Sequence, residues 1–226
     1  MIENRNNSWL VGVPQFILGL FIVLQIISML TYSGGTFFDP QNTGYSFTRN
    51  FLSDLGRTES FSGNINFIPS LLFNMSLLLA GGVFVMFYFN IRSLFLEGNY
   101  IGLAFLGSVF GILGGIALVG VGLTPSDLYL SFHELSATWM FRCFFVASLC
   151  YSIIIYRSDF IENKYAFGYF LFALSILFYI FISELGPSPM GSELALTIQV
   201  VSQKIIIFVF VSAVYLQTRG IQKLNN

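Results

Sequence analysis

Six long apolar runs constrain the fold of this sequence more than any other feature. The runs extend over about 11–31, 67–89, 100–123, 132–156, 166–183 and 194–216. Each comes close to the roughly 20 residues that an α-helix needs to cross a bilayer. With 55% hydrophobic and only 9% charged residues, a chain of 226 residues has more apolar surface than a water-soluble core could bury. The sequence therefore predicts an all-α, polytopic membrane protein with a bundle of six transmembrane helices.

The connections between the runs predict a single transmembrane domain over residues 1–226. All of them are short except the first, at about 32–66, which has no clear periodicity. The first apolar run must be compared with a signal peptide, whose apolar core is only about 7–15 residues long. Here the apolar stretch continues from Trp9 to Leu30 without a small-residue cleavage site close after a short core. We therefore expect a retained helix.

Lysine and arginine in the connections predict the orientation, because positive residues near the ends of spans stay on the cytoplasmic side. The amino terminus, the second and fourth connections and the carboxyl terminus carry Arg5, Arg92, Arg157, Lys164, Arg219 and Lys223. The other side carries only Arg49 and Arg57, both in the first connection. This asymmetry predicts cytoplasmic termini in a cell membrane (plasma or inner membrane), with the 32–66 connection outside.

Acidic residues then gather on the outer face, although they were not used to assign it. They are Asp39, Asp54, Glu59, Asp127, Glu134, Glu184 and Glu193, and the only histidine, His133, joins them. Asp54, Asp127 and His133 are candidates for acid–base catalysis, since carboxylates and imidazole often transfer protons in enzymes. A structural role is also open, because Ser131 and Glu134 have the S-x-x-E spacing of a capping box at the start of the fourth helix.

Two cations fall inside apolar runs, Arg142 in the fourth and Lys204 in the sixth. Each lies about ten residues from the outer end of its run, or roughly 15 Å along a helix, near mid-depth of the hydrocarbon core. A cation there costs on the order of 2.5–3.5 kcal/mol, so it must pair, reach the surface or face water. The candidate partners are Glu193, Glu134, Asp54, Asn74, Gln199 and Gln203. Glu193 and Lys204 share one face of the sixth helix, and we expect Arg142 and Lys204 to face one cavity.

A resemblance to a known family adds to these candidates. The motif Asn50-x-x-Ser53-Asp54-Leu55-Gly56 is followed by Leu72-Phe73-Asn74, by Gly122-x-x-Pro125 and by His133. In this order the motifs resemble the bacterial integral-membrane family called domain of unknown function 998 and, more distantly, the Frag1/DRAM/Sfk1 group of six-span proteins. The resemblance covers most of the chain and implies a six-helix bundle without an assigned activity. By position it singles out Ser53, Asp54, Gly56, Asn74, Pro125 and His133.

Three interpretations of function remain open. In the first, the protein binds, senses or transports a lipid or a small anionic ligand in an outward-facing cavity within the membrane. Its ligand-binding residues would be Arg142, Lys204, Glu193, Glu134, Asn74, Ser53 and Asp54. In the second, it is an enzyme that acts on a lipid or lipid-linked substrate at the outer leaflet through Asp54, Asp127 or His133. In the third, Glu193 and Glu134 only neutralise Lys204 and Arg142.

Several other functions are excluded by what the sequence lacks. One histidine cannot supply the several ligands of the zinc-dependent membrane hydrolases or the paired ligands of a b-type haem. There is no phosphate-binding glycine loop, and the few basic residues form no surface for nucleic acid. We therefore expect membrane lipids as partners and no metal, cofactor or nucleic acid.

Gly107, Gly111 and Gly115 recur at the spacing that lets helices approach closely in lipid, which predicts a packing role.

Overall fold

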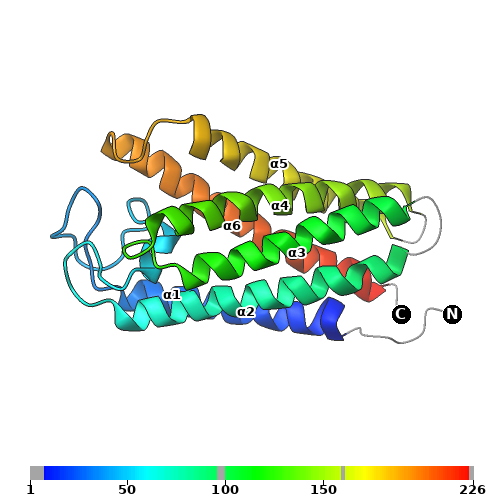
Figure 1. Ribbon diagram of the computed structural model, residues 1–226, viewed down its shortest axis with the longest axis horizontal. Helices are drawn as coiled ribbons and strands as arrows, with labels where there is room; N and C mark the ends of the chain where they lie inside the picture. Colours follow the sequence, from blue (N-terminus) through cyan, green and yellow to red (C-terminus); the bar gives the residue numbers. More distant parts are fainter. Residues whose placement is uncertain (1–7, 96–99, 159–160, 224–226) are drawn as a thin grey trace.

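The computed structural model describes residues 8–95, 100–158 and 161–223, and in these ranges it contains six long α-helices and no β-strand. The helices are α1 (Val13–Thr31), α2 (Phe67–Ile91), α3 (Ile101–Leu123), α4 (Leu130–Arg157), α5 (Asn163–Leu185) and α6 (Glu193–Gln222). Short helical turns precede α1 (η1, Ser8–Gly12), interrupt the first connection (η2, Leu52–Gly56) and follow α2 (η3, Arg92–Phe95). The predicted all-α bundle is confirmed (Figure 1).

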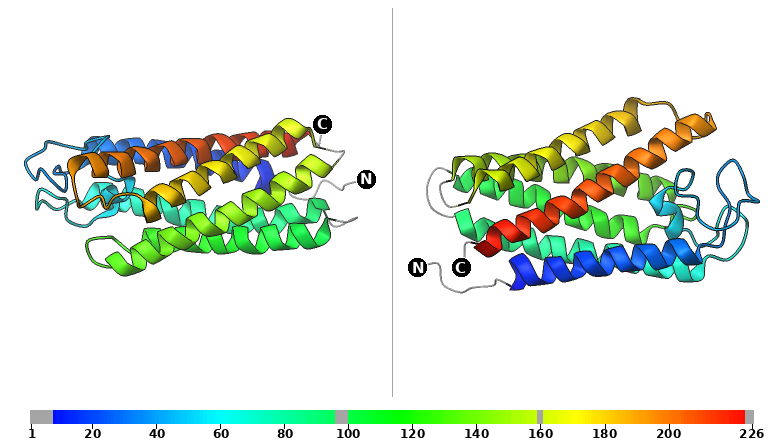
Figure 2. Two further views of the ribbon diagram at one scale, coloured as in Figure 1. Left: turned by 90° about the horizontal axis from the view of Figure 1, so that it is seen from above. Right: turned by 180° about the vertical axis from the view of Figure 1, so that it is seen from behind.

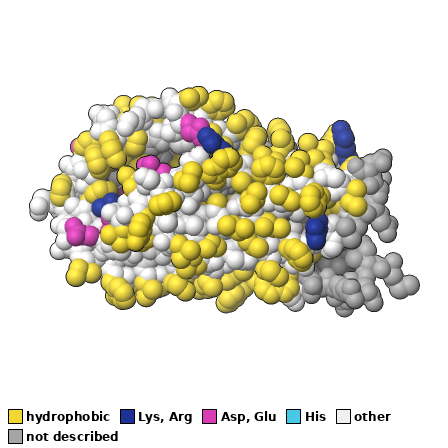
Figure 3. Space-filling model, in the orientation of Figure 1, with side chains coloured by type: hydrophobic (Ala, Val, Ile, Leu, Met, Phe, Trp, Pro, Cys, Tyr) yellow, Lys and Arg dark blue, Asp and Glu magenta, His cyan; other side chains and the backbone are white. Residues whose placement is uncertain are grey.

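The outside of the bundle has the character of a membrane protein. All six helices are long and apolar enough to cross a bilayer. Large apolar side chains lie exposed along them, among them Leu30 at 81%, Phe208 at 73% and Phe16 at 68%. Figure 3 shows hydrophobic side chains along the whole length of the bundle. The chain is therefore an integral, multi-pass membrane protein, because lipid solvates these side chains and water would not.

The glycines of α3 bring it close to its neighbours α2 and α4. A Cβ atom on Gly81 of α2 would lie 2.7 Å from the backbone oxygen of Gly115, so these two helices touch through their backbones. A Cβ atom on Gly111 would overlap the ring of Tyr88. On the other side, one on Gly107 would lie 2.9 Å from Cys150 of α4. The predicted packing role of the α3 glycines is confirmed, since any larger side chain at these positions would keep the neighbouring helices from approaching so closely.

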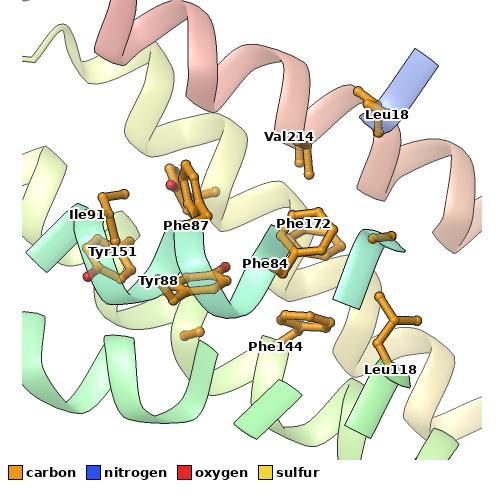
Figure 4. Close-up of a cluster of buried hydrophobic side chains, with 14 of the residues drawn as sticks. Leu18, Phe84, Phe87, Tyr88, Ile91, Leu118, Phe144, Tyr151, Phe172 and Val214 are labelled. Carbon is orange, nitrogen blue, oxygen red and sulfur yellow. The ribbon is translucent and has the colours of Figure 1, made fainter. Parts of the chain in front are cut away.

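Aromatic rings fill the centre of the bundle (Figure 4). Phe84 of α2 meets Phe144 of α4 edge to face, with ring centroids 5.8 Å apart. Phe172 of α5 and Phe210 of α6 have centroids 5.5 Å apart. Such ring pairs add about 0.5–1.5 kcal/mol each beyond the area that they bury, and they hold neighbouring helices together.

Helix α6 closes the bundle obliquely and so creates the space for the candidate site. Its last turns pack against α1, where Gln15 Nε2 donates to Thr218 Oγ1 at 3.0 Å. Towards its first turns it diverges from α1 and pairs with α5 (Figure 2). The space between α6 and α2 is filled by η2, which packs against both. We call this the loop end of the bundle, formed by residues 32–66, 124–129 and 186–192; α1 begins and α6 ends at the opposite end (Figure 1).

The predicted capping box at the start of α4 is wrong. The helix begins at Leu130 with Tyr129 as its N-cap, and in the described part of the chain no side chain caps it. A tight turn carries the chain into the helix instead, because the amide of Tyr129 donates to the oxygen of Pro125 at 2.9 Å. Ser131 therefore lies inside the helix, and Glu134 is left to face the loop end.

Candidate functional site

The first connection folds back into the bundle at the loop end. Leu55 is fully buried at 0% exposure, and Asp54 is only 6% exposed. Asn66, at the start of α2, fixes this turn by donating from Nδ2 to the backbone oxygens of Leu55 at 3.1 Å and Arg57 at 3.0 Å. We call residues 50–57 the plug. Side-chain amides satisfy its backbone, which a turn buried in a membrane protein requires.

Gly56 lets the plug lie directly on α2. A Cβ atom at this position would lie 2.6 Å from Phe73 Cδ1 and 2.7 Å from Asn74 Oδ1. The backbone oxygen of Gly56 accepts hydrogen bonds from Ser70 Oγ at 2.9 Å and from Asn74 Nδ2 at 3.1 Å. Asn74, which the sequence suggested as a ligand-binding residue, therefore anchors the plug. This contact explains why Gly56 and Asn74 occur together in the motif.

Lys204 and its neighbour Gln203 fasten the plug to α6. Lys204 Nζ donates to the backbone oxygen of Asn50 at 2.6 Å, and it lies 5.4 Å and 5.1 Å from the ring centres of Tyr45 and Phe47. Gln203 Oε1 accepts from the amide of Leu52 at 2.7 Å. The cation inside the sixth apolar run thus binds a carbonyl group and two rings. Both kinds of contact replace the water that the ammonium group loses.

Asp54 is the buried acid of the plug. Its Oδ2 accepts from the amide of Phe51 at 2.7 Å and from Asn50 Nδ2 at 3.3 Å. Burial raises the pKa of Asp54 to about 6, although the hydrogen bond from Asn50 and the charges of Arg57 and Lys204 oppose the rise. The carboxyl group therefore changes its charge close to neutral pH, within a turn that α6 holds in place.

Asp127 joins two loops and lies apart from Asp54. Its carboxylate accepts from the amide of Thr58 at 2.9 Å, from the Thr58 hydroxyl and from the amide of Glu59 at 3.0 Å. Partial burial raises the pKa of Asp127, but these hydrogen bonds outweigh it and hold the pKa below its usual value. The arrangement keeps Asp127 ionised and makes it a clasp between the first and third connections.

Arg142 reaches across to α5. Its Nη2 donates to both oxygens of Glu184, at 2.9 Å and 3.0 Å, and its guanidinium lies 5.6 Å from the ring centre of Trp139. The side chains of Arg142 and Glu184 are 44% and 38% exposed. Glu193 instead forms an ion pair with Arg49 at 3.5 Å.

These pairs differ from those expected from the sequence. Glu184 neutralises Arg142, and neither Glu134 nor Glu193 pairs with either cation in the described ranges. The reason is tertiary, since the tilt of α5 brings Glu184 to Arg142. Arg142 and Lys204 lie in different surroundings, one beside α5 and one beneath the plug, and not in the single cavity that we expected.

His133 lies in the first turns of α4 and is 8% exposed. Its Nδ1 lies 2.7 Å from the backbone oxygen of Thr124. Because a carbonyl oxygen only accepts, Nδ1 carries the proton. Among the described residues no carboxylate forms a hydrogen bond to this ring, and none of them forms a group of three or more His, Cys, Asp or Glu that could hold a metal ion. Asp54, Asp127 and His133 are thus not joined as one catalytic unit.

Two cavities adjoin at the loop end. The first, which we call the chamber, has a volume of about 560 Å³ and is lined by the plug, α4, α5 and α6. Its charged lining residues are Arg49, Asp54, Arg57, Glu134 and Glu184, with His133 beside them. Figure 3 shows acidic side chains in a hollow near the loop end. The chamber lies between α4 and the splayed ends of α5 and α6.

The second cavity, the inner pocket, lies deeper in the bundle and has a volume of about 110 Å³. Its wall is largely apolar and includes Phe21, Phe73, Phe144, Phe172 and Phe210, one each from α1, α2, α4, α5 and α6. The chamber and the inner pocket share the lining residues Ser53, His133, Ala137, Phe141 and Gln203. The surroundings therefore change from charged to apolar across this shared wall.

The match to a known family covers most of the residues that build these cavities. The family described as a protein of unknown function, DUF998, matches residues 26–214, from the end of α1 to most of α6. The chain belongs to this family. The resemblance of its motifs to DUF998 is thereby confirmed, whereas the more distant likeness to the Frag1/DRAM/Sfk1 group stays an expectation. Neither a curated protein nor a solved structure matches this DUF998 chain.

In this DUF998 protein the sequence motifs point to the chamber only in part. Of the suggested site residues, Ser53, Asp54, His133 and Glu134 line it, and Asn74, Asp127, Glu193, Arg142 and Lys204 do not. Sequence reasoning missed Arg57 and Arg49 as lining residues, although they are the two basic residues of the outer connections. It also proposed Gln203 only as a partner for a cation, whereas Gln203 lies in the wall that both cavities share.

Proposed function

We propose that this member of the DUF998 family binds an amphipathic lipid in the two adjoining cavities. The polar head would occupy the chamber, and an apolar chain would enter the inner pocket. The observation that carries this proposal is the shared wall of Ser53, His133, Ala137, Phe141 and Gln203. An occupant that crosses this wall meets polar groups at one end and only apolar groups at the other, which is the pattern of an amphiphile.

The character of each cavity supports this assignment. Beyond the polar groups of the shared wall, the inner pocket is lined by apolar side chains. Such a space gives water too few partners, so an apolar chain is a better occupant. The chamber of about 560 Å³ falls within the range of about 300–1,000 Å³ that is typical of small-molecule sites, and its charged groups can fix the position of a polar head.

The location of the chamber follows from the orientation that we propose. The described basic residues at the end opposite the chamber are Arg92, Arg157, Lys164, Arg219 and Lys223, against Arg49 and Arg57 in the connections of the loop end. This asymmetry supports cytoplasmic termini in a cell membrane. The chamber would then open at the outer leaflet, where lipids can reach it.

The contacts of the candidate acid–base residues favour binding over catalysis at the outer leaflet. Asp127 is occupied by the amides of Thr58 and Glu59, and Asp54 by the plug. His133 bonds to a backbone carbonyl group instead of a carboxylate. An enzyme that used these residues would need each of them to exchange partners.

Lipid retention tests the proposal. We expect native mass spectrometry of the purified protein, transferred from membranes in mild detergent, to show a retained amphiphile. Ala80→Leu adds bulk to the wall of the inner pocket and should reduce retention about tenfold, which corresponds to about 1.4 kcal/mol. Gly82→Ala on the same helix is the matched control, because a Cβ atom there meets no other atom within 4 Å.

Two results would overturn the proposal. One is a wild-type protein that retains no lipid under conditions in which its thermal unfolding transition is intact. The other is Ala80→Leu protein with the wild-type transition and the same lipid retention as Gly82→Ala. An equal decrease in lipid retention in both variants would also count against the inner pocket as the binding site of the lipid's apolar chain.

A further inference from the structure

We infer that the occupant is a single-chain phospholipid whose head group carries both a phosphate and an ammonium group. This inference rests on the proposed function and specifies its ligand. Two independent features of the cavities support it: the size of the inner pocket and the charges that remain without an ion-pair partner in the chamber.

The inner pocket has room for one chain and not for two. Its volume of about 110 Å³ is somewhat smaller than an apolar cavity of roughly 150 Å³ that holds one benzene molecule. Scaled from that cavity, it can take about four carbons from the end of a single acyl chain. All six long helices and the plug contribute to its wall, so the surrounding elements leave no space beside the first chain for a second.

Most charges around the chamber already have partners. Arg49 pairs with Glu193, and Glu184 accepts from Arg142. Asp54 is held by backbone and amide donors of the plug, and the positive charges of Arg57 and Lys204 also act on it, although neither cation forms an ion pair with it in the described ranges. These groups balance one another without a ligand, and a head group would have to break existing contacts to use them.

Arg57 is a cation of the chamber wall that forms no ion pair in the described part of the chain. Its Nε donates to the backbone oxygen of Glu59 at 3.0 Å, and its guanidinium lies 4.2 Å from the ring centre of Phe61. These contacts hold the group in place, and no carboxylate pairs with it in the described ranges. A fixed guanidinium offers paired N–H donors that match a phosphate group.

Glu134 is the corresponding negative group. It lines the chamber from the first turns of α4, next to His133, and it forms no ion pair within the residues that the structure describes. A carboxylate in this position can accept from an ammonium group. A head group with only negative charge would be attracted by Arg57 but repelled by Glu134, whereas a zwitterionic head satisfies both.

Binding of three lipids distinguishes the possibilities. The probes are lysophosphatidylethanolamine, lysophosphatidate with the same acyl chain, and diacyl phosphatidylethanolamine, titrated onto the full-length protein in detergent and followed by native mass spectrometry. Lysophosphatidate lacks the ammonium group, and the diacyl lipid carries a second chain. We expect wild-type protein to bind the first lipid about tenfold more tightly than lysophosphatidate, the effect of one charge-assisted contact. It should also bind the diacyl lipid more weakly than the first lipid, because the inner pocket has no space for a second chain.

Three variants assign the preference to residues. Glu134→Gln should weaken binding of lysophosphatidylethanolamine about tenfold and leave lysophosphatidate unchanged or tighter, so that the head-group preference disappears. Arg57→Gln should weaken both single-chain lipids about tenfold, and Arg57→Lys should restore part of the affinity. Arg219→Gln is the matched control, because it removes one guanidinium at the opposite end of the bundle, where Arg219 Nη1 donates to Gln222 Oε1 at 3.3 Å.

The outcomes separate this inference from the proposed function. Wild-type protein that binds none of the three lipids overturns the ligand assignment, and it overturns the proposed function as well when the purified protein also retains no amphiphile. Wild-type protein that binds lysophosphatidate or the diacyl lipid as tightly as lysophosphatidylethanolamine overturns the ligand assignment and leaves lipid binding standing. Glu134→Gln protein with an unchanged thermal transition and an unchanged lipid preference does the same.

Discussion

Lys204 Nζ and the backbone oxygen of Asn50 lie 2.6 Å apart, although 154 positions separate the two residues in the sequence. The contact joins α6 to the plug, and the plug in turn provides Ser53 and Asp54 to the chamber wall. A cation placed inside an apolar helix therefore has a structural use: it fixes the loop that shapes the proposed binding site.

Removing this cation should destabilise the protein strongly. Lys204→Met leaves the carbonyl group of Asn50 without its donor and Asp54 without the nearby positive charge. Loss of a buried hydrogen bond from a charged donor costs about 1.5–3 kcal/mol, and we expect a decrease of this order in the free energy of unfolding in detergent. The double variant Lys204→Met, Asp54→Asn should lose less than the sum of the two single variants.

Arg142→Gln is the control for Lys204→Met, because Arg142 also lies within a transmembrane helix and has a carboxylate partner. Its ion pair with Glu184 is about half exposed, so its loss should cost at most about 1 kcal/mol. An equal decrease in the free energy of unfolding for Lys204→Met and Arg142→Gln would show that the contact of Lys204 with the plug stabilises the protein no more than an exposed ion pair does.

The stability of the protein should depend on the charge of Asp54. Burial raises its pKa from 3.8 to about 6, so the proton binds more tightly to the folded than to the unfolded protein. The resulting stabilisation is fully present below about pH 4 and is lost as the pH rises through about 6, and it amounts to about 3 kcal/mol at most. Asp54→Asn removes the titrating group while keeping a similar side-chain shape.

The measurement is the difference in free energy of unfolding between wild type and Asp54→Asn from pH 4 to pH 7. Wild type should lose stability relative to the variant over this range, since other acids titrate in both proteins and cancel. A difference that stays constant with pH would contradict the burial of an ionisable Asp54.

Gly56→Ala should displace the plug from α2. The added methyl group would lie within 3 Å of Phe73 and Asn74, and forcing extra volume into such a contact costs about 1–3 kcal/mol. Thermal unfolding should show a lower transition temperature. Gly82→Ala, where a Cβ atom has space, should leave the transition unchanged or raise it, as alanine favours a helix over glycine.

Asp127→Asn should loosen the contact between the first and third connections. An amide has only one acceptor oxygen in place of the charged carboxylate that binds Thr58 and Glu59, and we expect a loss of about 1 kcal/mol. Hydrogen exchange at the amides of Thr58 and Glu59 should become faster. The same contact should weaken in wild type as the pH falls through the lowered pKa of Asp127.

Glu59→Gln is the matched change for Asp127→Asn, because Glu59 takes part in the clasp through its backbone amide and not its carboxylate. It should leave exchange at both amides near the wild-type rate. If the amides of Thr58 and Glu59 exchange no faster in Asp127→Asn protein than in Glu59→Gln protein, the contacts of Asp127 do not hold the two loops together.

Parts of the candidate site were predictable from single residues. Asp54, Ser53 and His133 were selected by motif and line the chamber, and the need of Lys204 for a partner followed from its place in an apolar run. The identity of that partner did not follow. The partner is a backbone oxygen in a loop. Every residue carries such an oxygen, so the residue types do not indicate which one accepts from Lys204.

The pairing of Arg142 shows the same limit. Helical periodicity compares residues on one helix, and it favoured Glu134 and Glu193 as partners for the two cations. Glu184 reaches Arg142 from the next helix, because α5 tilts along α4. The cap expected at Ser131 was wrong for a related reason, since the turn from Pro125 to Tyr129 starts α4 earlier than its apolar run suggests.

The membrane fold and its six helices could be predicted from the residues alone, because each apolar residue contributes locally and additively to the preference for lipid. Tertiary structure alone decided which charges meet, where the plug lies and how the chamber joins the inner pocket. Those features depend on the tilt of α6 and on contacts between residues far apart in the chain. The energy of each such contact depends on the distance between two side chains on different helices, and no local pattern of residues determines that distance.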